Sequence, residues 1–319
     1  MQTAFPAENQ VGSDQIHEGL EKVFKVSEYL NFPFTLDEVA TYFLPKTKLT
    51  GEQLRSILTT HNFADIPFQV KDGYLLISAS QSDTSRLERE RMSAAKLDSA
   101  AKFARVLTRL VPFIRTVAVT GSVAYGSADK WDDIDLFIIT QRNRLWITAF
   151  MTLVLVRLNK LLGLRPPHLS LFCLSYVHDQ EGFDEESHLN RTNPLFAREL
   201  LKAKPVAGSD QYRKLLEKNH WVGELYSLPY TAKLKDLKGE TSDQRVGADD
   251  AIRFSFLLNW GEGIVFPILR CYLSIRAYLT NLKLSSRGQN LRVFSTKMSP
   301  VSCIYTSKFY EWLLALWGE

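Results

Sequence analysis

The sequence predicts an α+β protein in which a small N-terminal module precedes a small mixed sheet and a helical region closes the chain. Three patterns predict this: helical spacing of apolar residues before a hairpin signal, alternating strand-like segments near the middle, and long apolar helical segments after them. The 319 residues suffice for two or three domains. We expect three regions, at residues 1–84, 85–205 and 206–319.

The composition excludes several classes of protein. Apolar residues make up 45% of the chain and charged residues 23%, which excludes disordered and collagen-like chains. The three cysteines are far apart, so they predict neither a disulfide framework nor a CxxC metal site. Residues 145–156 form an uncharged apolar run that is too short to cross a bilayer and that we expect to be buried in a core. With no signal-peptide pattern, these features predict a cytoplasmic protein without a transmembrane span.

The N-terminal module resembles a winged helix. Helical spacing begins near residue 14, and Thr35 is a plausible N-cap for a second helix. Thr50 and Gln53 form a capping box for a third helix. The Asp-Gly pair at 72–73 then predicts a hairpin.

The charge of this module argues against duplex DNA as its partner. Residues 14–78 contain six Lys and Arg against nine Asp and Glu, a net charge of −3. Duplex binding depends on neutralising phosphates with basic side chains, and this module offers no basic face. A packing or partner-docking role is the favoured interpretation.

Strand and helix signals alternate through the middle of the chain. A long helical stretch over residues 85–114 leads into a strand at 116–121, a small-residue turn, and a second strand at 133–140. An apolar helix over 143–164 and a third strand at 169–177 follow. The polar stretch 233–250 predicts a mobile loop, and residues 252–283 predict a further helix.

Two carboxylates and a small-residue turn form the segment that carries chemistry. Side chains alternate along a strand, so Asp133 and Asp135 point to the same side about 7 Å apart. Side by side, they repel each other unless a cation lies between them, and Mg²⁺ is the natural cation because it prefers oxygen ligands shared with phosphates. Gly121 allows a phosphate to approach the backbone closely, and Ser122 adds a hydroxyl donor. The set points to phosphoryl or nucleotidyl transfer.

These residues are similar to the nucleotidyltransferase superfamily (DNA polymerase β-like), in particular its small stand-alone members with the form GSxxxG…SDIDL. Here the form is Gly-Ser-Val-Ala-Tyr-Gly at 121–126, followed by Asp-Asp-Ile-Asp-Leu at 132–136. The resemblance implies a nucleotidyltransferase core with a small mixed sheet. It also implies that Gly121 and Ser122 hold the β- and γ-phosphates of an NTP, and that Asp133 and Asp135 bind Mg²⁺ or Mn²⁺.

The chain departs from the family pattern at the third carboxylate, which many members carry on a later strand. The expected strand, 169–177, contains no acid. Asp179 is the nearest candidate for a third catalytic acid, and Asp184 and Glu185 are looser ones. Three more residues complete the predicted nucleotide-binding set: Ser127, Arg142 and Arg144.

A basic segment lies near the C-terminus. Between Gly263 and Tyr310 the chain has no Asp or Glu. It has seven basic residues there: Arg270, Arg276, Lys283, Arg287, Arg292, Lys297 and Lys308. This segment is interpreted as a solvated face, a clamp on the triphosphate or on a phosphorylated acceptor, or a contact for RNA or an anionic membrane.

The leading hypothesis is a Mg²⁺-dependent nucleotidyltransferase that moves an NMP from an NTP to an acceptor and releases pyrophosphate. A small molecule with a hydroxyl or phosphate is favoured as the acceptor over tRNA or protein. The alternative is a catalytically degenerate NTP-binding regulator whose N-terminal module docks a partner or DNA. The absence of an acid from the third strand favours this alternative, whereas the intact Gly-Ser and Asp-x-Asp set opposes it.

Overall fold

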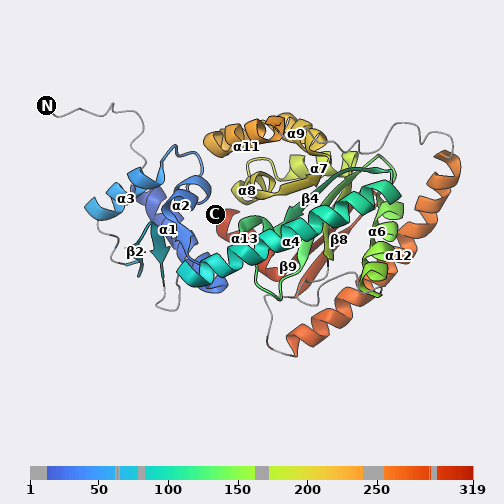
Figure 1. The fold of residues 1–319 in the computed structure, drawn as a ribbon, viewed down its shortest axis with the longest axis horizontal. Helices are drawn as coiled ribbons and strands as arrows, with labels where there is room; N and C mark the ends of the chain where they lie inside the picture. The colour runs from blue at the N-terminus through green and yellow to red at the C-terminus, as the bar shows by residue number, and fades with distance from the viewer. Residues whose placement is uncertain are drawn as a thin grey trace. The chain divides into compact units, whose positions relative to one another are not determined.

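A computed structural model describes residues 13–61, 63, 65–77, 83–161, 172–239, 255–286, 288 and 293–318. The chain divides into two compact units (Figure 1). The first comprises Met1–Leu87 with Gly223–Thr231, and the second comprises Glu88–Val222 with Ala232–Glu319. The division of the chain at residues 84 and 205 stays a prediction.

The first unit combines three helices with a three-stranded antiparallel sheet in the order β1-β3-β2. The capping box predicted at Thr50 and Gln53 is confirmed, and Thr35 forms a second one with Glu38. Arg86 donates to both carboxylate oxygens of Glu38. The elements are α1 (Ser13–Leu30), β1 (Phe34–Thr35), α2 (Leu36–Tyr42), α3 (Gly51–Thr60), β2 (Gln69–Lys71) and β3 (Tyr74–Leu76). The winged-helix identity of this unit stays a prediction.

The second unit is built on a six-stranded mixed sheet in the order β7-β4-β5-β6-β9-β8. The β5–β6 pair is parallel and every other pair is antiparallel. The strands are β4 (Ile114–Thr120), β5 (Ile134–Thr140), β6 (Phe172–Asp179), β7 (Lys204–Ala207), β8 (Phe294–Met298) and β9 (Ser302–Ser307). The predicted α+β class with a small mixed sheet is confirmed.

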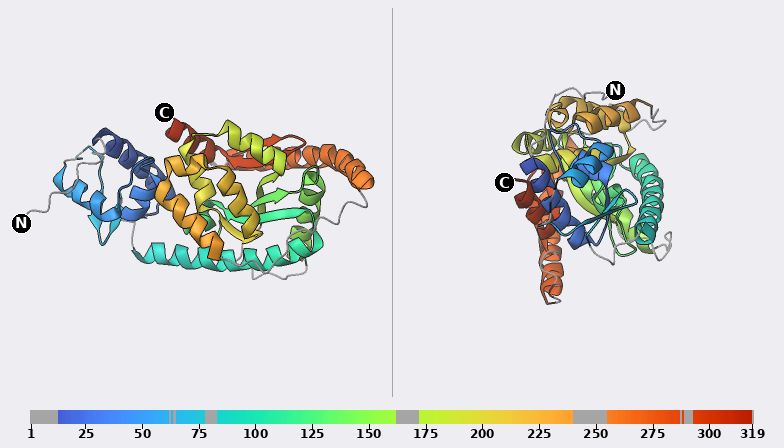
Figure 2. Two further views of the ribbon diagram at one scale, coloured as in Figure 1. Left: turned by 90° about the horizontal axis from the view of Figure 1, so that it is seen from above. Right: turned by 90° about the vertical axis from the view of Figure 1, so that its left-hand side faces the viewer.

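Helices cover both faces of this sheet (Figures 1 and 2). On one face the main core contains Phe103 and Leu107 of α4, Trp146 of α6 and Leu269 of α12. On the other face Phe137 of β5 packs edge-on against Phe183 of α7 and Tyr212 of α9. The helices of this unit include α4 (Asp83–Leu110), α5 (Gly121–Tyr125), α6 (Leu145–Leu161), α7 (Gln180–Leu189), α8 (Pro194–Lys202), α9 (Ser209–Lys218), α12 (Ser255–Ser285) and α13 (Lys308–Gly318). The chain passes between the two units within α4, α10 (Trp221–Leu225) and α11 (Ser227–Gly239).

Three sequence-based expectations need correction. Residues 233–239 of the predicted mobile loop are helical, because Leu237 is buried and Lys233 donates to the carbonyl of Ala203. Residues 240–250 lie outside the described residues. The predicted helices of the C-terminal region are confirmed, but the hairpin β8–β9 joins them. Helix α6 buries one side only, since Phe150, Val154 and Leu158 are 47%, 39% and 44% exposed.

No helix among the described residues combines the length and the apolar character that crossing a bilayer would require.

Candidate active site

The turn from β4 into α5 lies against the start of β5. β4 ends at Thr120, which pairs with Asp135, and α5 begins at Gly121. Gly121 has a φ of +63°, and a Cβ added to it would lie 2.3 Å from Oδ2 of Asp135. A side chain at this position would therefore be strained in its backbone and would also collide with the carboxylate. Glycine is what allows the turn to pack directly on Asp135.

Asp133 and Asp135 flank a buried residue. Ile134 is fully buried, whereas Asp133 is exposed and Asp135 is partly buried. The hydroxyl of Ser175 on β6 donates to Oδ1 of Asp135 over 2.5 Å. Ser175 is skipped in the β5–β6 pairing, where the register shifts between Leu136 and Phe137. Such a bulge re-aims side chains, and here it brings a hydroxyl to the carboxylate.

The environment of Asp135 disfavours its ionised form. Burial raises the pKa of this carboxyl to about 7, with the hydrogen bond from Ser175 acting in the opposite direction. The negative charges of Asp133, Asp132 and Glu199 raise the pKa further. A carboxylate in such a position is stabilised by any cation that binds beside it.

A buried lysine orders the loop that precedes the two aspartates. Lys96 on α4 donates to the carbonyls of Asp129 and Asp132 over 2.6 and 2.5 Å. Burial lowers the pKa of its ammonium, while the surrounding aspartates raise it. Asp132 accepts a bond from the Asp129 amide. Asp132 therefore shapes the loop, and Lys96 is a site-supporting residue that sequence reasoning missed.

The turn after α5 is closed by the two serines of the predicted phosphate-binding set. The backbone amide of Ser127 donates to the Ser122 carbonyl over 2.9 Å, and the Ser127 hydroxyl reaches the same oxygen at 3.4 Å. Arg89 donates to the carbonyl of Ser127. The structure thus keeps Gly121, Ser122 and Ser127 in one compact turn beside Asp135.

Residues 100–205, which contain this turn and both aspartates, match a family model described as a nucleotidyltransferase domain. The chain carries a nucleotidyltransferase domain. The match supports the assignment of the chain to the nucleotidyltransferase superfamily and to the transferase enzymes. Neither the curated proteins nor the solved structures contain a match to the chain.

The nucleotidyltransferase domain offers a donor set that fits a hard divalent cation. Asp133 and Asp135 provide carboxylate oxygens, the ligand type that Mg²⁺ and Mn²⁺ prefer. Burial, together with the like charges of nearby acids, raises the pKa of Asp135 to about 7, and a cation bound beside it would favour its ionised form. Among the described residues, no group of three or more His, Cys, Asp or Glu is arranged to hold a metal. The fit therefore rests on two protein carboxylates.

Asp179 was predicted as a third catalytic acid, and the structure places it elsewhere. It pairs with Thr140, at the opposite end of β5 from Asp135, which is about 17 Å along the strand. Its Oδ1 accepts from the amide of Gly182 as the N-cap of α7, and its Oδ2 accepts from the amide of Asn143. Asp179 therefore caps α7 and lies remote from Asp135, which argues against the predicted role as a third catalytic acid.

Arg142 and Arg144 also lie at the Asp179 end of the sheet of the nucleotidyltransferase domain. Arg142 pairs with Glu181 over 2.9 Å. Arg144 is buried and donates to Asn143 and to Asn259 of α12. The structure therefore does not bring these two predicted phosphate contacts to Asp135.

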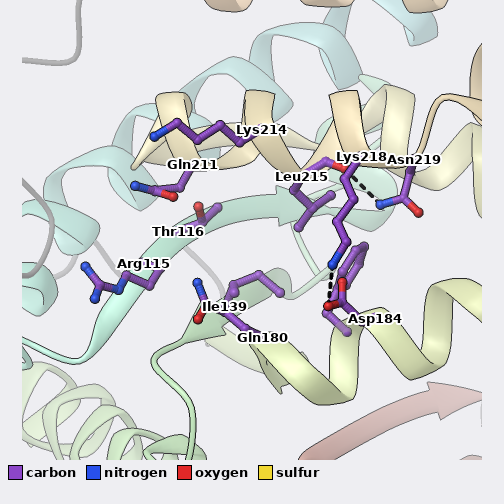
Figure 3. A pocket seen from close by; sticks show the side chains of 11 residues that line it. Arg115, Thr116, Ile139, Gln180, Asp184, Gln211, Lys214, Leu215, Lys218 and Asn219 are labelled. Carbon is purple, nitrogen blue, oxygen red and sulfur yellow. Dashed lines mark hydrogen bonds and ion pairs between the residues drawn. The ribbon is translucent and has the colours of Figure 1, made fainter.

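A pocket of about 320 Å³ lies at this same far end, between β4, α7 and α9 (Figure 3). Figure 3 shows Lys218 reaching Asp184, with which it forms an ion pair of 2.5 Å. The other residues that line the pocket are Arg115, Thr116, Ile139, Gln180, Phe183, Gln211, Lys214, Leu215 and Asn219. None of them belongs to the Gly-Ser turn or the Asp-x-Asp strand, so Asp184 is also remote from the candidate site.

A buried polar cluster supports α5 from the other side. The hydroxyl of Tyr125 donates to Oε1 of Glu199 over 2.6 Å, and Arg198 donates to Tyr125. Burial raises the pKa of Glu199, and the positive charge of Arg198 opposes this. Sequence reasoning missed this cluster, although a Glu and an Arg beside Leu200 on a strongly amphipathic helix were a signal.

The basic residues of the C-terminal segment lie in different places in the structure. Burial raises the pKa of Cys173, the residue that pairs with Asp135, to about 12, and the positive charge of Arg276 opposes this slightly. Lys297 instead pairs with Glu186 on α7. Arg270, Lys283 and Lys308 are exposed, whereas Arg287 and Arg292 lie outside the described residues.

Proposed function

We propose that the chain is a Mg²⁺- or Mn²⁺-dependent nucleotidyltransferase that moves an NMP from an NTP to a hydroxyl or phosphate of a small acceptor and releases pyrophosphate. The observation that carries the proposal is the packing of the Gly121 turn on Asp135. This packing places the Gly-Ser turn beside a carboxylate whose pKa is raised by burial.

The transfer needs one bond to form and one to break. An oxygen of the acceptor attacks the α-phosphorus, the bond from that phosphorus to the bridging oxygen breaks, and pyrophosphate leaves. The proton of an acceptor hydroxyl passes to solvent or to a nearby base. A bound divalent cation supplies charge neutralisation at the triphosphate.

The residues of this chain contribute binding and orientation. Asp133 and Asp135 would hold the cation, and Ser175 fixes the carboxylate of Asp135. Gly121 and Ser122 would contact the β- and γ-phosphates, and Ser127 keeps that turn closed. Lys96 holds the loop that positions Asp133.

Label transfer tests the proposal. The wild type and Asp133→Asn are incubated with each of four α-labelled NTPs, with Mg²⁺ or Mn²⁺, and with a host extract divided into metabolites, RNA and protein. Label entering the metabolite fraction with the wild type alone is the expected result. Label entering the RNA or protein fraction would contradict the small acceptor, and equal transfer by the variant would contradict the site.

A second candidate is an NTP-binding regulator without turnover, with the N-terminal unit docking a partner. The observation that favours it is that Cys173 and Ser175, rather than an acid, face Asp135 from the described part of β6. Equilibrium binding of a labelled NTP, measured beside label transfer, distinguishes the regulator from the enzyme. Mg²⁺-dependent binding that Asp133→Asn abolishes, with no label transferred to any fraction, would favour the regulator.

A further inference from the structure

Helix α12 has a second apolar side, opposite the one that packs on the core. Leu269, Leu273 and Ala277 form the buried stripe, at 5%, 9% and 5% exposure. Seven large apolar side chains, which we call the outer stripe, are between 48% and 69% exposed: Trp260, Ile264, Ile268, Ile275, Tyr278, Leu279 and Leu282. At 100° per residue these seven lie within one arc on the far side of the helix.

The outer stripe continues onto α6. Helices α6 and α12 lie side by side at one end of the second unit, as both views of that end show (Figures 1 and 2). Phe150, Val154 and Leu158 recur every four residues on the exposed side of α6. The guanidinium of Arg157 donates to the hydroxyl of Tyr272 and lies over its ring, which joins the two helices at this surface. The surface is thus larger than one helix face.

Basic side chains border the outer stripe on both edges. Arg270 falls on one edge by helical geometry, and Arg276 and Lys283 fall on the other. The sequence has no Asp or Glu from residue 263 to residue 310. A long stripe of exposed apolar residues is unusual on a monomeric protein and marks an interaction surface. Here the surface combines apolar contact with a purely positive rim.

We propose that the outer stripe of α12, with the exposed side of α6, binds the surface of an anionic lipid bilayer, with α12 lying in the plane of the interface. The apolar side chains would enter the acyl boundary, Trp260 and Tyr278 would sit at the headgroup level, and the arginines and lysine would reach the anionic headgroups. Face-to-face pairing with a second copy fits less well, because the described rim residues of the two surfaces carry the same positive charge and would repel each other.

Vesicle co-sedimentation of the full chain tests this proposal, which does not depend on the nucleotidyl-transfer activity. The probes are phosphatidylcholine vesicles with and without phosphatidylglycerol. We expect sedimentation with the anionic vesicles and its loss at high salt. The variant Ile268→Asp/Ile275→Asp should bind at least about a hundredfold more weakly, and Arg270→Gln/Lys283→Gln about tenfold more weakly.

Leu189→Asp is the matched control, because Leu189 is 71% exposed on α7, outside this surface. It should bind as the wild type does, and circular dichroism should show all variants folded. Absence of binding to anionic vesicles, equal binding by Ile268→Asp/Ile275→Asp, or an equal loss in Leu189→Asp would overturn the proposal. A dimer in solution that Ile268→Asp/Ile275→Asp converts to monomer would assign the surface to a second copy instead.

Discussion

Two aspartates on neighbouring parallel strands, Asp135 in β5 and Asp179 at the end of β6, have opposite surroundings. Both oxygens of Asp179 accept bonds from backbone amides, of Gly182 and Asn143. Asp135 accepts one bond from Ser175, and burial, together with like charges nearby, raises its pKa to about 7. Backbone donors to both oxygens are typical of a structural carboxylate, whereas a buried carboxylate of raised pKa beside other acids is one that a bound cation would stabilise.

The same difference extends to the two ends of the sheet. At the Asp135 end lie the glycine turn, the exposed Asp133 and the ordered loop held by Lys96. At the Asp179 end, charged residues are paired, as Arg142 is with Glu181. We infer that the Asp135 end performs chemistry and that the Asp179 end holds the fold together. The predictions below test this contrast, beginning with the largest expected effect.

The adjacent acids Asp132 and Asp133 should differ sharply. Asp133→Asn removes a proposed cation ligand from an exposed position, so transfer should fall by about a thousandfold with the stability unchanged. Asp132→Asn is the control, since Asp132 accepts from the Asp129 amide within the loop. It should retain most activity. Initial rates of label transfer measure both, and equal rates for the two variants would remove the distinction.

Buried His178 at the Asp179 end should make stability depend on pH. Burial lowers its pKa from 6.5 to about 4, with Glu186 and Lys297 as the charged groups that act on it and the Ser302 hydroxyl 3.1 Å from Nδ1. Between these two values the unfolded chain binds the proton and the folded chain does not. The free energy of unfolding should therefore fall by about 3 kcal/mol as the pH drops from 6.5 to 4.

Urea unfolding of the wild type and of His178→Gln across this pH range distinguishes the contribution of His178 to the pH dependence of stability from that of the carboxylates. The variant should lack this part of the pH dependence, whatever its absolute stability. If the free energy of unfolding depends on pH in the same way in both proteins, His178 does not contribute to this pH dependence.

Gly121 and Gly126 both have a positive φ, but only Gly121 lies against Asp135. Substitutions at the two glycines therefore distinguish the effect of backbone strain from the effect of the contact with Asp135. Gly121→Ala would place a Cβ against Oδ2 of Asp135, whereas a Cβ at Gly126 would meet only Cγ of Glu90, at 3.8 Å. The positive φ should make each substitution cost about 1 to 2 kcal/mol of stability, and the collision with Asp135 should add to this cost at Gly121. Gly121→Ala alone should lower turnover by about a hundredfold, because it displaces the carboxylate. Comparable turnover in both variants would show that the close packing has no role.

Removing the cap at Asp179 should affect stability but not chemistry. Asp179→Ala leaves the amides of Gly182 and Asn143 without their acceptor and should cost about 2 kcal/mol. Asp184→Ala removes only a partly exposed pair with Lys218 and should cost less than about 0.5 kcal/mol. Thermal unfolding compares the two, and a loss of stability in Asp184→Ala as large as that in Asp179→Ala would refute the capping role.

The local parts of the site were predictable from the sequence. Gly121, Ser122, Asp133 and Asp135 lie within one strand–turn–strand segment, where spacing and alternation of side chains determine position. The capping box at Thr50 was predictable for the same reason. Such features depend on neighbours a few residues away.

Features that depend on long-range pairing were not predictable. Asp179 follows an apolar strand as a catalytic acid could, and only the β5–β6 register shows that it lies at the wrong end. Lys96 shares a helix face with Ala100 and Ala104, which signalled a buried lysine but not its partners. The short strand β8 has few large apolar residues and is defined by its pairing with β9. Periodicity also could not tell which side of α12 meets the core.

The central claim is that Asp135 serves chemistry while Asp179 serves the fold, and one paired measurement tests it most directly. Asp135→Asn and Asp179→Asn are assayed together for label transfer per folded molecule and for the midpoint of thermal unfolding. The account predicts that Asp135→Asn loses transfer and keeps or raises its midpoint, because it removes like-charge repulsion, whereas Asp179→Asn keeps transfer and melts earlier. Transfer retained by Asp135→Asn, or lost by folded Asp179→Asn, would contradict it.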